Sequence, residues 1–207
     1  SALFLAALAW TSQARGELIL NVTLDYDQER DHVATQAVFA DLTRFLGRAL
    51  GQSVKLIMTQ NAERVGEHIR TGTYSMMLVP AQLVGLAMRN GYTPVARTER
   101  DTQVVLVAGK NSRARSLDGA RNKRIVLLHQ ESLVSYMVRG EMNALGFAPA
   151  KFFSQVQYMN QYGAVLYALD IGQAEIAAMK SDVAKGWISR NPGAAVIKTL
   201  TSVPQAG

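Results

Sequence analysis

Residues 125–145 read IVLLHQESLVSYMVRGEMNAL, a short apolar run that passes through a polar turn into a stretch of helical period. The run 125–128 predicts a buried strand, and the spacing of apolar residues over 133–145 predicts an amphipathic helix. Ser132 stands at the position of a helix N-cap. A strand that leads directly into a helix is the repeating unit of parallel α/β proteins.

The same alternation extends in both directions along the chain. Glycines follow two of the predicted helices, at Gly51 and Gly72, where a helix C-terminus favours them. The pattern predicts an α/β fold of mostly parallel sheets flanked by helices. The predicted strands cover 18–24, 54–58, 75–79, 104–107, 125–128, 152–156 and 176–179, and the predicted helices cover 33–50, 63–70, 80–88, 133–145, 162–171 and 182–189.

No linker rich in proline, glycine or serine divides the chain, so domain boundaries follow from topology. We expect lobe 1 over 17–101, lobe 2 over 102–192 and a return segment toward lobe 1 over 193–207. Hinges are then expected near 100–103 and 191–195. In such a fold the ligand cleft lies between the lobes, outside the carboxyl ends of the strands.

Composition restricts the functional classes. The 207 residues are 48% apolar and 18% charged, which excludes a disordered or coiled-coil chain, and the net charge is +6. Most of that excess lies between Arg97 and Arg124, a basic stretch without any aromatic residue, so a solvated face explains it better than nucleic-acid binding. Cysteine is absent, so neither a disulfide framework nor a thiol nucleophile is possible.

The N-terminal run 2–10, ALFLAALAW, is too short to span a bilayer. It is followed by a small-x-small pattern at 12–14, which is typical of a signal-peptidase site. We interpret 1–16 as the remnant of a secretory signal and expect a periplasmic protein. A genuine N-terminal helix or strand is the alternative.

The sequence carries no catalytic motif. It contains neither a nucleophile elbow, a P-loop, a dinucleotide-binding loop nor a zinc-protease helix, and only three histidines, His32, His68 and His129. Alternating carboxylates at 25–31 resemble a calcium loop, but they lack its glycine and its final glutamate. Carboxylates at the start of a helix explain them better. We predict no enzyme, no catalytic residue, no cofactor and no metal.

Polar residues gather where predicted strands lead into helices. Backbone N–H groups at helix N-termini can hold an anion without any catalytic residue. Capping explains each of these junctions taken singly, and their shared location favours a binding cleft. Candidate residues at them are Gln82, His129, Ser132, Ser135, Tyr162, Lys180 and Ser181.

Over about 53–198 the sequence resembles the periplasmic solute-binding proteins of ABC importers, of the phosphate, phosphite and phosphonate type. The likeness rests on the order and spacing of several patterns: GTYSMMLVP at 72–80, AMRNGYTPVAR at 87–97, SLDGARNKRIV at 116–126, the stretch 132–146 and YALDIGQAE at 167–175. The resemblance implies a two-lobed, type 2 periplasmic-binding fold that closes on a small anion without catalysis. It also implies an ABC permease in the membrane as partner.

The resemblance places residues in the site, with departures. Family members hold the ligand oxygens with a Ser-Thr-Ser run, whereas 132–135 reads SLVS and only Ser132 matches. Gln82 and Thr102 replace tyrosines, Tyr162 replaces a histidine, and Lys180 replaces an aspartate. This lysine would disfavour an amine on the ligand and favour a carboxylate or sulfonate. The predicted ligand-binding residues are Tyr26, Gln82, Thr102, His129, Ser132, Ser135, Tyr162, Lys180 and Ser181.

Two functional classes stay open at this point. The first is an importer's solute-binding protein, a monomer that binds no nucleic acid. The second is a periplasmic sensor domain that reports the ligand to a signal-transduction receptor. Family members usually continue beyond the position of Gly207, so we expect a C-terminally truncated or reduced first lobe.

Overall fold

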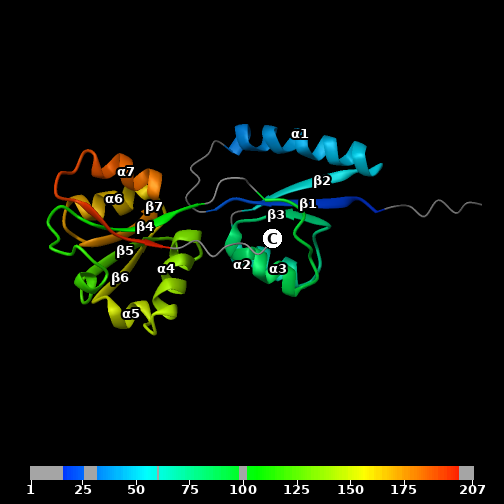
Figure 1. The fold of residues 1–207 in the computed structure, drawn as a ribbon. Helices are drawn as coiled ribbons and strands as arrows, with labels where there is room; N and C mark the ends of the chain where they lie inside the picture. The colour runs from blue at the N-terminus through cyan, green and yellow to red at the C-terminus, as the bar shows by residue number, and fades with distance from the viewer. Residues whose placement is uncertain (1–15, 26–31, 60, 98–101, 201–207) are drawn as a thin grey trace, which may run out of the picture.

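Two sheets, one in each half of the chain, organise the protein (Figure 1). The computed structural model describes residues 16–25, 32–59, 61–97 and 102–200. Each sheet carries helices on both faces, so the chain forms two α/β lobes, as the sequence predicts. The positions of the lobe boundaries at 101 and 192 stay predictions.

The first lobe contains a three-stranded parallel sheet of order β2-β1-β3, in which Leu18 pairs with Val54 and Leu20 with Met76. Helix α1 covers one face of the sheet, and α2 and α3 cover the other (Figure 1). Its elements are β1 (Leu18–Thr23), α1 (His32–Leu50), β2 (Val54–Thr59), α2 (Ala62–Arg70), β3 (Met76–Leu78) and α3 (Ala81–Arg89).

The second lobe contains a five-stranded sheet of order β6-β5-β7-β4-β8. Strands β6, β5 and β7 are parallel, whereas β4 runs antiparallel to both of its neighbours. Its elements are β4 (Val104–Ala108), η1 (Asp118–Ala120), β5 (Arg124–Leu128), α4 (Leu133–Ala144), α5 (Pro149–Phe152), β6 (Gln155–Met159), α6 (Tyr162–Asp170), β7 (Ile176–Lys180), α7 (Ser181–Ile188) and β8 (Ala195–Leu200).

The larger core lies in the second lobe. Every residue of β4 is buried, and so are Ile125–Leu128 of β5 and Ile176–Met179 of β7. These buried stretches are apolar because α4 and α5 cover one face of the sheet while α6 and α7 cover the other (Figure 1). The first lobe has two smaller clusters, one on each face of its sheet.

Local signals explain several helix ends. The side chain of Asn61 accepts a hydrogen bond of 2.9 Å from the backbone N–H of Arg64, which caps α2. Gly51 and Gly72 follow α1 and α2 with φ of +62° and +64°, a left-handed conformation that glycine adopts without strain. The helix stops predicted at these two glycines are confirmed.

The predicted strand over 152–156 is wrong in its position. Pro149 begins the short helix α5, which ends at Phe152, and the strand β6 starts only at Gln155. Phe152 and Phe153 are 1% and 3% exposed and belong to the core. An apolar run of this length is compatible with a buried helix or a buried strand, and proline at the first helical position settles the choice.

The hinge expected near 191–195 is also wrong. Ala195 pairs with Ala108, at the end of β4 opposite to Val104, so the chain there is far from the start of β4. Strand β8 then runs back along β4 until Leu200 pairs with Val104. The other expected hinge, near 100–103, falls partly outside the described residues, and the destination of the return segment stays a prediction.

Glu175, just before β7, is held by two cations. Its carboxylate lies 3.1 Å from Lys123 Nζ and accepts a 3.4 Å hydrogen bond from the backbone N–H of Arg124. Burial raises the pKa of the Glu175 carboxyl, but the hydrogen bonds and charges of Lys123 and Arg124 outweigh burial and hold that pKa below its ordinary value of 4.5. The ionised carboxylate therefore stabilises the fold.

We expect Glu175→Gln to lower the free energy of unfolding near pH 7, and the difference from the wild type to shrink in acid. A carboxyl whose pKa is depressed in the folded state stabilises the protein above its unfolded pKa and loses that effect as the pH falls through the folded pKa. Urea unfolding at several pH values between 7 and 3 measures this difference. A difference that stays constant below pH 4.5 would contradict the role of the ion pair.

Candidate functional site

The carboxyl ends of β5, β6 and β7 meet at one edge of the second sheet because these strands are parallel. Helices α4, α6 and α7 begin directly after them. Val104, the first residue of β4, pairs with Lys180 and with Leu200, so the chain enters and leaves the second sheet at this same edge. The edge that carries the predicted binding residues therefore faces the connection to the first lobe.

Serines shape the start of α4. Ser132 is the N-cap, and its Oγ accepts a 3.2 Å hydrogen bond from the backbone N–H of Ser135. The hydroxyl of Ser135 donates to the carbonyl of Leu128, at 2.6 Å, and both serines are fully buried. The Ser135 hydroxyl proton is thus committed to the end of β5, which favours a structural role for this side chain.

His129 forms the turn between β5 and α4. Its Nδ1 accepts a 3.2 Å hydrogen bond from the backbone N–H of Glu131, and its carbonyl accepts one of 2.8 Å from the N–H of Ser132. Acceptance at Nδ1 requires that this nitrogen carries no proton. His129 therefore stabilises the turn that sets the direction of α4.

Tyr162, Lys180, Ser181 and Thr102 lie at the same edge of the second sheet. The backbone N–H of Lys180 donates to the hydroxyl of Tyr162 at 3.2 Å, and the N–H of Ser181 donates to the carbonyl of Gln103 at 2.9 Å. Thr102 comes directly before Gln103 and is half-buried. The structure thus brings the starts of α6 and α7 and the beginning of β4 to one place.

The first lobe contributes Gln82 and Asp25. Gln82, in the first turn of α3, donates from Nε2 to Asp25 Oδ1 and to the carbonyl of Glu131, both at 3.1 Å. The Asp25 carboxylate, which follows β1, accepts from the backbone N–H of Leu133 at 3.2 Å to Oδ1 and 3.3 Å to Oδ2. These hydrogen bonds join the two lobes at the start of α4.

Asp25 is the site residue that the sequence analysis missed as a ligand contact. From the sequence, Asp25 is one of several carboxylates explained by the start of α1. The structure instead places its carboxylate at the N-terminus of α4. The available signal was its position directly after a strand, at the edge where parallel strands present their carboxyl ends. Tyr26, the predicted neighbour, lies outside the described residues, as do Asp27, Glu29 and Asp31.

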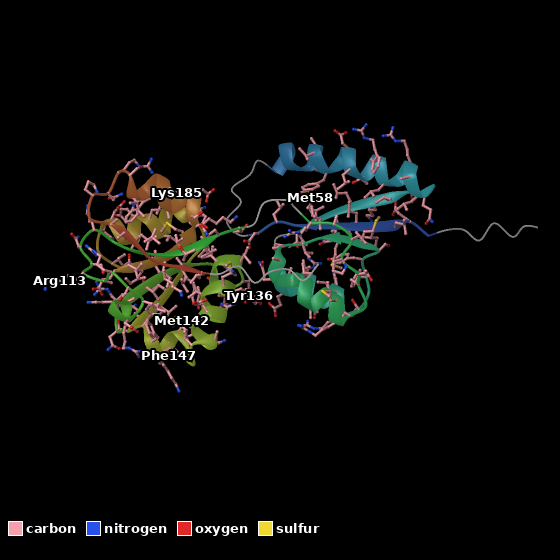
Figure 2. All side chains as sticks on the ribbon, in the orientation of Figure 1. Met58, Arg113, Tyr136, Met142, Phe147 and Lys185 are labelled. Carbon is pink, nitrogen blue, oxygen red and sulfur yellow. The ribbon has the colours of Figure 1, made fainter. Side chains whose placement is uncertain are left out.

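Charged and aromatic residues line the exposed side of α4. The Tyr136 hydroxyl donates to Glu131 Oε2 at 3.0 Å, and the Arg139 guanidinium lies 4.4 Å from the centre of the Tyr136 ring. Burial and the neighbouring Glu131 carboxylate raise the pKa of Tyr136. Figure 2 shows Tyr136 on α4, at the side of the second lobe toward the first. The hydrogen bond from Tyr136 holds the side chain of Glu131 in place. The backbone carbonyl of Glu131 accepts the hydrogen bond from Gln82 Nε2.

Neither a metal centre nor a membrane span is found within 16–25, 32–59, 61–97 and 102–200. No three His, Asp or Glu side chains of that part gather closely enough to hold a metal ion. None of its helices combines the length and the apolar character that crossing a bilayer requires.

The comparisons with known proteins identify relatives. A family model described as the periplasmic substrate-binding protein of a phosphonate ABC transporter matches residues 27–205. A binding-protein component of an ABC phosphonate transporter from Pseudomonas aeruginosa is 14% identical, with a TM-score of 0.58 over 91% of this chain and 67% of that chain. PhnD1 from Prochlorococcus marinus, solved with methylphosphonate, is 18% identical, with a TM-score of 0.60 over 87% of this chain and 72% of that chain.

A Xanthomonas citri protein solved with ATP is 14% identical, with a TM-score of 0.70 over 89% of this chain and 72% of that chain. No curated protein matches by sequence. The structural likenesses show the two-lobed fold, and the family match covers most of the 207 residues. The chain therefore belongs to the family of periplasmic substrate-binding proteins of phosphonate ABC transporters, which are not enzymes.

Proposed function

We propose that the chain binds a small oxyanion at the start of α4, between the two lobes, and delivers it to an ABC permease. Membership of the family places the protein in the periplasm, with a small anionic solute and a permease as partners. The preferred ligand is a sulfonate, a carboxylate or a phosphonate without an amine.

The carboxylate of Asp25 at the backbone N–H of Leu133 carries this proposal. Leu133 is the first residue of a helix of 12 residues, where the N–H groups lack intrahelical partners and the helix dipole is positive. The distances of 3.2 and 3.3 Å from the Leu133 nitrogen to the Asp25 carboxylate oxygens support the fit of an oxyanion group at this helix end. Sulfonate and phosphonate oxygens would accept the same hydrogen bond.

Lys180 supports the choice of ligand. It caps α7 at the same edge of the sheet, and its backbone N–H donates to Tyr162, a neighbour in the proposed site. An ammonium group at this edge attracts an anionic group and repels the amine of an aminoalkyl phosphonate. The side chains of Gln82, Thr102, His129, Ser132 and Ser181 are proposed to complete the site with Tyr26, whereas Ser135 contributes by holding the helix start.

The basic stretch between Arg97 and Arg124 supports the absence of a nucleic-acid partner. The Arg121 guanidinium lies 4.7 and 4.8 Å from the rings of Phe147 and Phe152, and Arg124 donates to the carbonyls of Gly172 and Gln173. Arg115 donates to the carbonyls of Ser112 and Ala114. These cations are used within the fold rather than gathered for phosphates.

We further propose that the chain acts as a monomer and that its apolar start directs export. The support for export is the run 2–10 with the small-x-small pattern after it. Sequencing the N-terminus of the protein recovered from a periplasmic extract tests this point. Removal of the residues up to about position 14 agrees with a signal peptide, and retention of the run contradicts it.

Calorimetric titration of the ligand-free protein tests the binding proposal. We expect methanesulfonate, methylphosphonate or acetate to bind and 2-aminoethylphosphonate to bind more weakly than methylphosphonate. Lys180→Met should weaken sulfonate binding about tenfold or more, because a charge-assisted interaction is lost. Lys185→Met, an exposed change on helix α7, which begins directly after Lys180, is the matched control and should leave the affinity unchanged.

Two outcomes of this titration would contradict the proposal. If none of the oxyanions binds, the α4 start is not an anion site in solution. If only aminoalkyl phosphonates bind, Lys180 does not select against an amine and the preferred ligand class is wrong.

A further inference from the structure

The side chain of Asp25 forms hydrogen bonds between the two lobes. It follows β1 of the first lobe and is only 6% exposed, and both of its carboxylate oxygens lie within hydrogen-bond distance of the Leu133 N–H in the second lobe. A carboxylate that is removed from water at this depth needs hydrogen bonds in return. The Leu133 N–H and the Gln82 side chain provide them.

Gln82 adds to this contact between the lobes. One of its amide hydrogens reaches Asp25 and the other reaches the carbonyl of Glu131, so a single side chain of α3 binds residues of both lobes. Its Oε1 is buried without a hydrogen-bond partner among the described residues. An unsatisfied buried oxygen is costly, so this contact is less favourable than one in which every polar atom of Gln82 is paired.

We propose that Asp25 is a resident anion that occupies the ligand's place and holds the lobes together until a ligand oxyanion replaces it. The inference rests on the proposed function, because it concerns the same Leu133 N–H. Two anions at one N–H would repel strongly in a partly buried site. The ligand therefore binds only the fraction of molecules in which Asp25 has left, which lowers its apparent affinity.

Removing the charge of Asp25 tests this competition. In Asp25→Asn and Asp25→Ser, methanesulfonate or methylphosphonate should bind about tenfold more tightly than in the wild type. Asp118→Asn, which removes an exposed carboxylate of the second lobe, is the charge-matched control and should leave affinity unchanged. Two variants are used so that a folding defect in one does not decide the result. Unchanged or weaker binding in both would overturn the proposal.

A distance measurement separates this proposal from the binding function itself. The chain has no cysteine, so Arg70→Cys on α2 and Lys185→Cys on α7 can carry a pair of spin labels, one in each lobe. Without ligand, Asp25→Asn should broaden the interlobe distances or shift them to larger values. If the distances shift but no oxyanion binds, the Asp25 contact stands and the proposed function fails. If oxyanions bind and neither the distances nor the affinity change, the proposed function stands and the Asp25 proposal fails.

Discussion

Leu133→Pro, introduced into Asp25→Asn so that no carboxylate competes for the site, is expected to weaken oxyanion binding by about 10- to 100-fold while α4 stays folded. Proline is favoured at the first position of a helix, because its missing N–H has no intrahelical partner there. The preceding residue, Ser132, already has φ of −71° and ψ of 154°, the extended conformation that proline requires before it. The substitution removes the N–H that holds the carboxylate of Asp25 in the wild type, and it also replaces the leucine side chain. A charge-assisted hydrogen bond contributes about 1.5 to 3 kcal/mol, which gives the expected factor.

Leu133→Ala in the same Asp25→Asn background is the matched control for this prediction. It shortens the same half-buried side chain but keeps the backbone N–H, so the affinity should change by less than about threefold. Circular dichroism of both variants checks that α4 keeps its helical content. If the proline and alanine variants bind methanesulfonate equally, the N–H of Leu133 takes no part in binding, and the site must be sought elsewhere along the edge.

The sequence predicts the start of α4 well because its signals are local. The apolar run that ends at Leu128, the cap at Ser132 and the helical period after it lie within a few residues of one another. The same reasoning places Tyr162 and Lys180 beside helix starts, and the structure joins them through the Lys180 N–H. The residues that directly follow parallel strands can therefore be predicted to lie at a shared edge of the sheet.

The contact between Asp25 and Leu133 could not be predicted in this way. The two residues are 108 positions apart and belong to different lobes, so no spacing links them. The favourable effect of a carboxylate near the start of α1 already explains Asp25 locally. The sequence therefore gives no reason to expect its contact with the distant helix α4. Ser135 illustrates the opposite case: a serine that suggests an anion site is used to bind the carbonyl at the end of β5.

The errors in the fold have a similar cause. The run around Phe152 is apolar because it is buried, and burial alone does not distinguish a helix from a strand. The expected second hinge placed the chain's departure before β8, whereas β8 adds a further strand beside β4 before the chain reaches the interlobe edge at Leu200. The position of β6 and the course of the chain through β8 both depend on pairing with strands distant in sequence. The periodicity within either segment does not predict such pairing.

Phe152→Ala is expected to lower the free energy of unfolding of the second lobe by about 3 to 5 kcal/mol. Phe152 is 1% exposed, and its ring centre lies 5.4 Å from that of Phe147 and 4.9 Å from that of Phe153. The Arg121 guanidinium also lies against it. Truncation leaves a cavity beneath α5 and removes two ring contacts, because the neighbouring β6 is fixed by its pairing with β5. Figure 2 shows Phe147 in this part of the lobe.

Urea unfolding followed by the fluorescence of Trp187 measures this loss. Trp187 is 3% exposed on α7 and reports the second lobe, and Trp10→Phe removes the only other tryptophan of the chain. Tyr158→Ala, at a position 41% exposed on β6, is the control and should cost about 1 kcal/mol or less. Because α5 lies away from the first lobe, the ligand affinity of folded Phe152→Ala should stay within about threefold of the wild type. A weak effect on unfolding together with a large loss of affinity would show that this cluster supports the binding edge rather than the stability of the lobe.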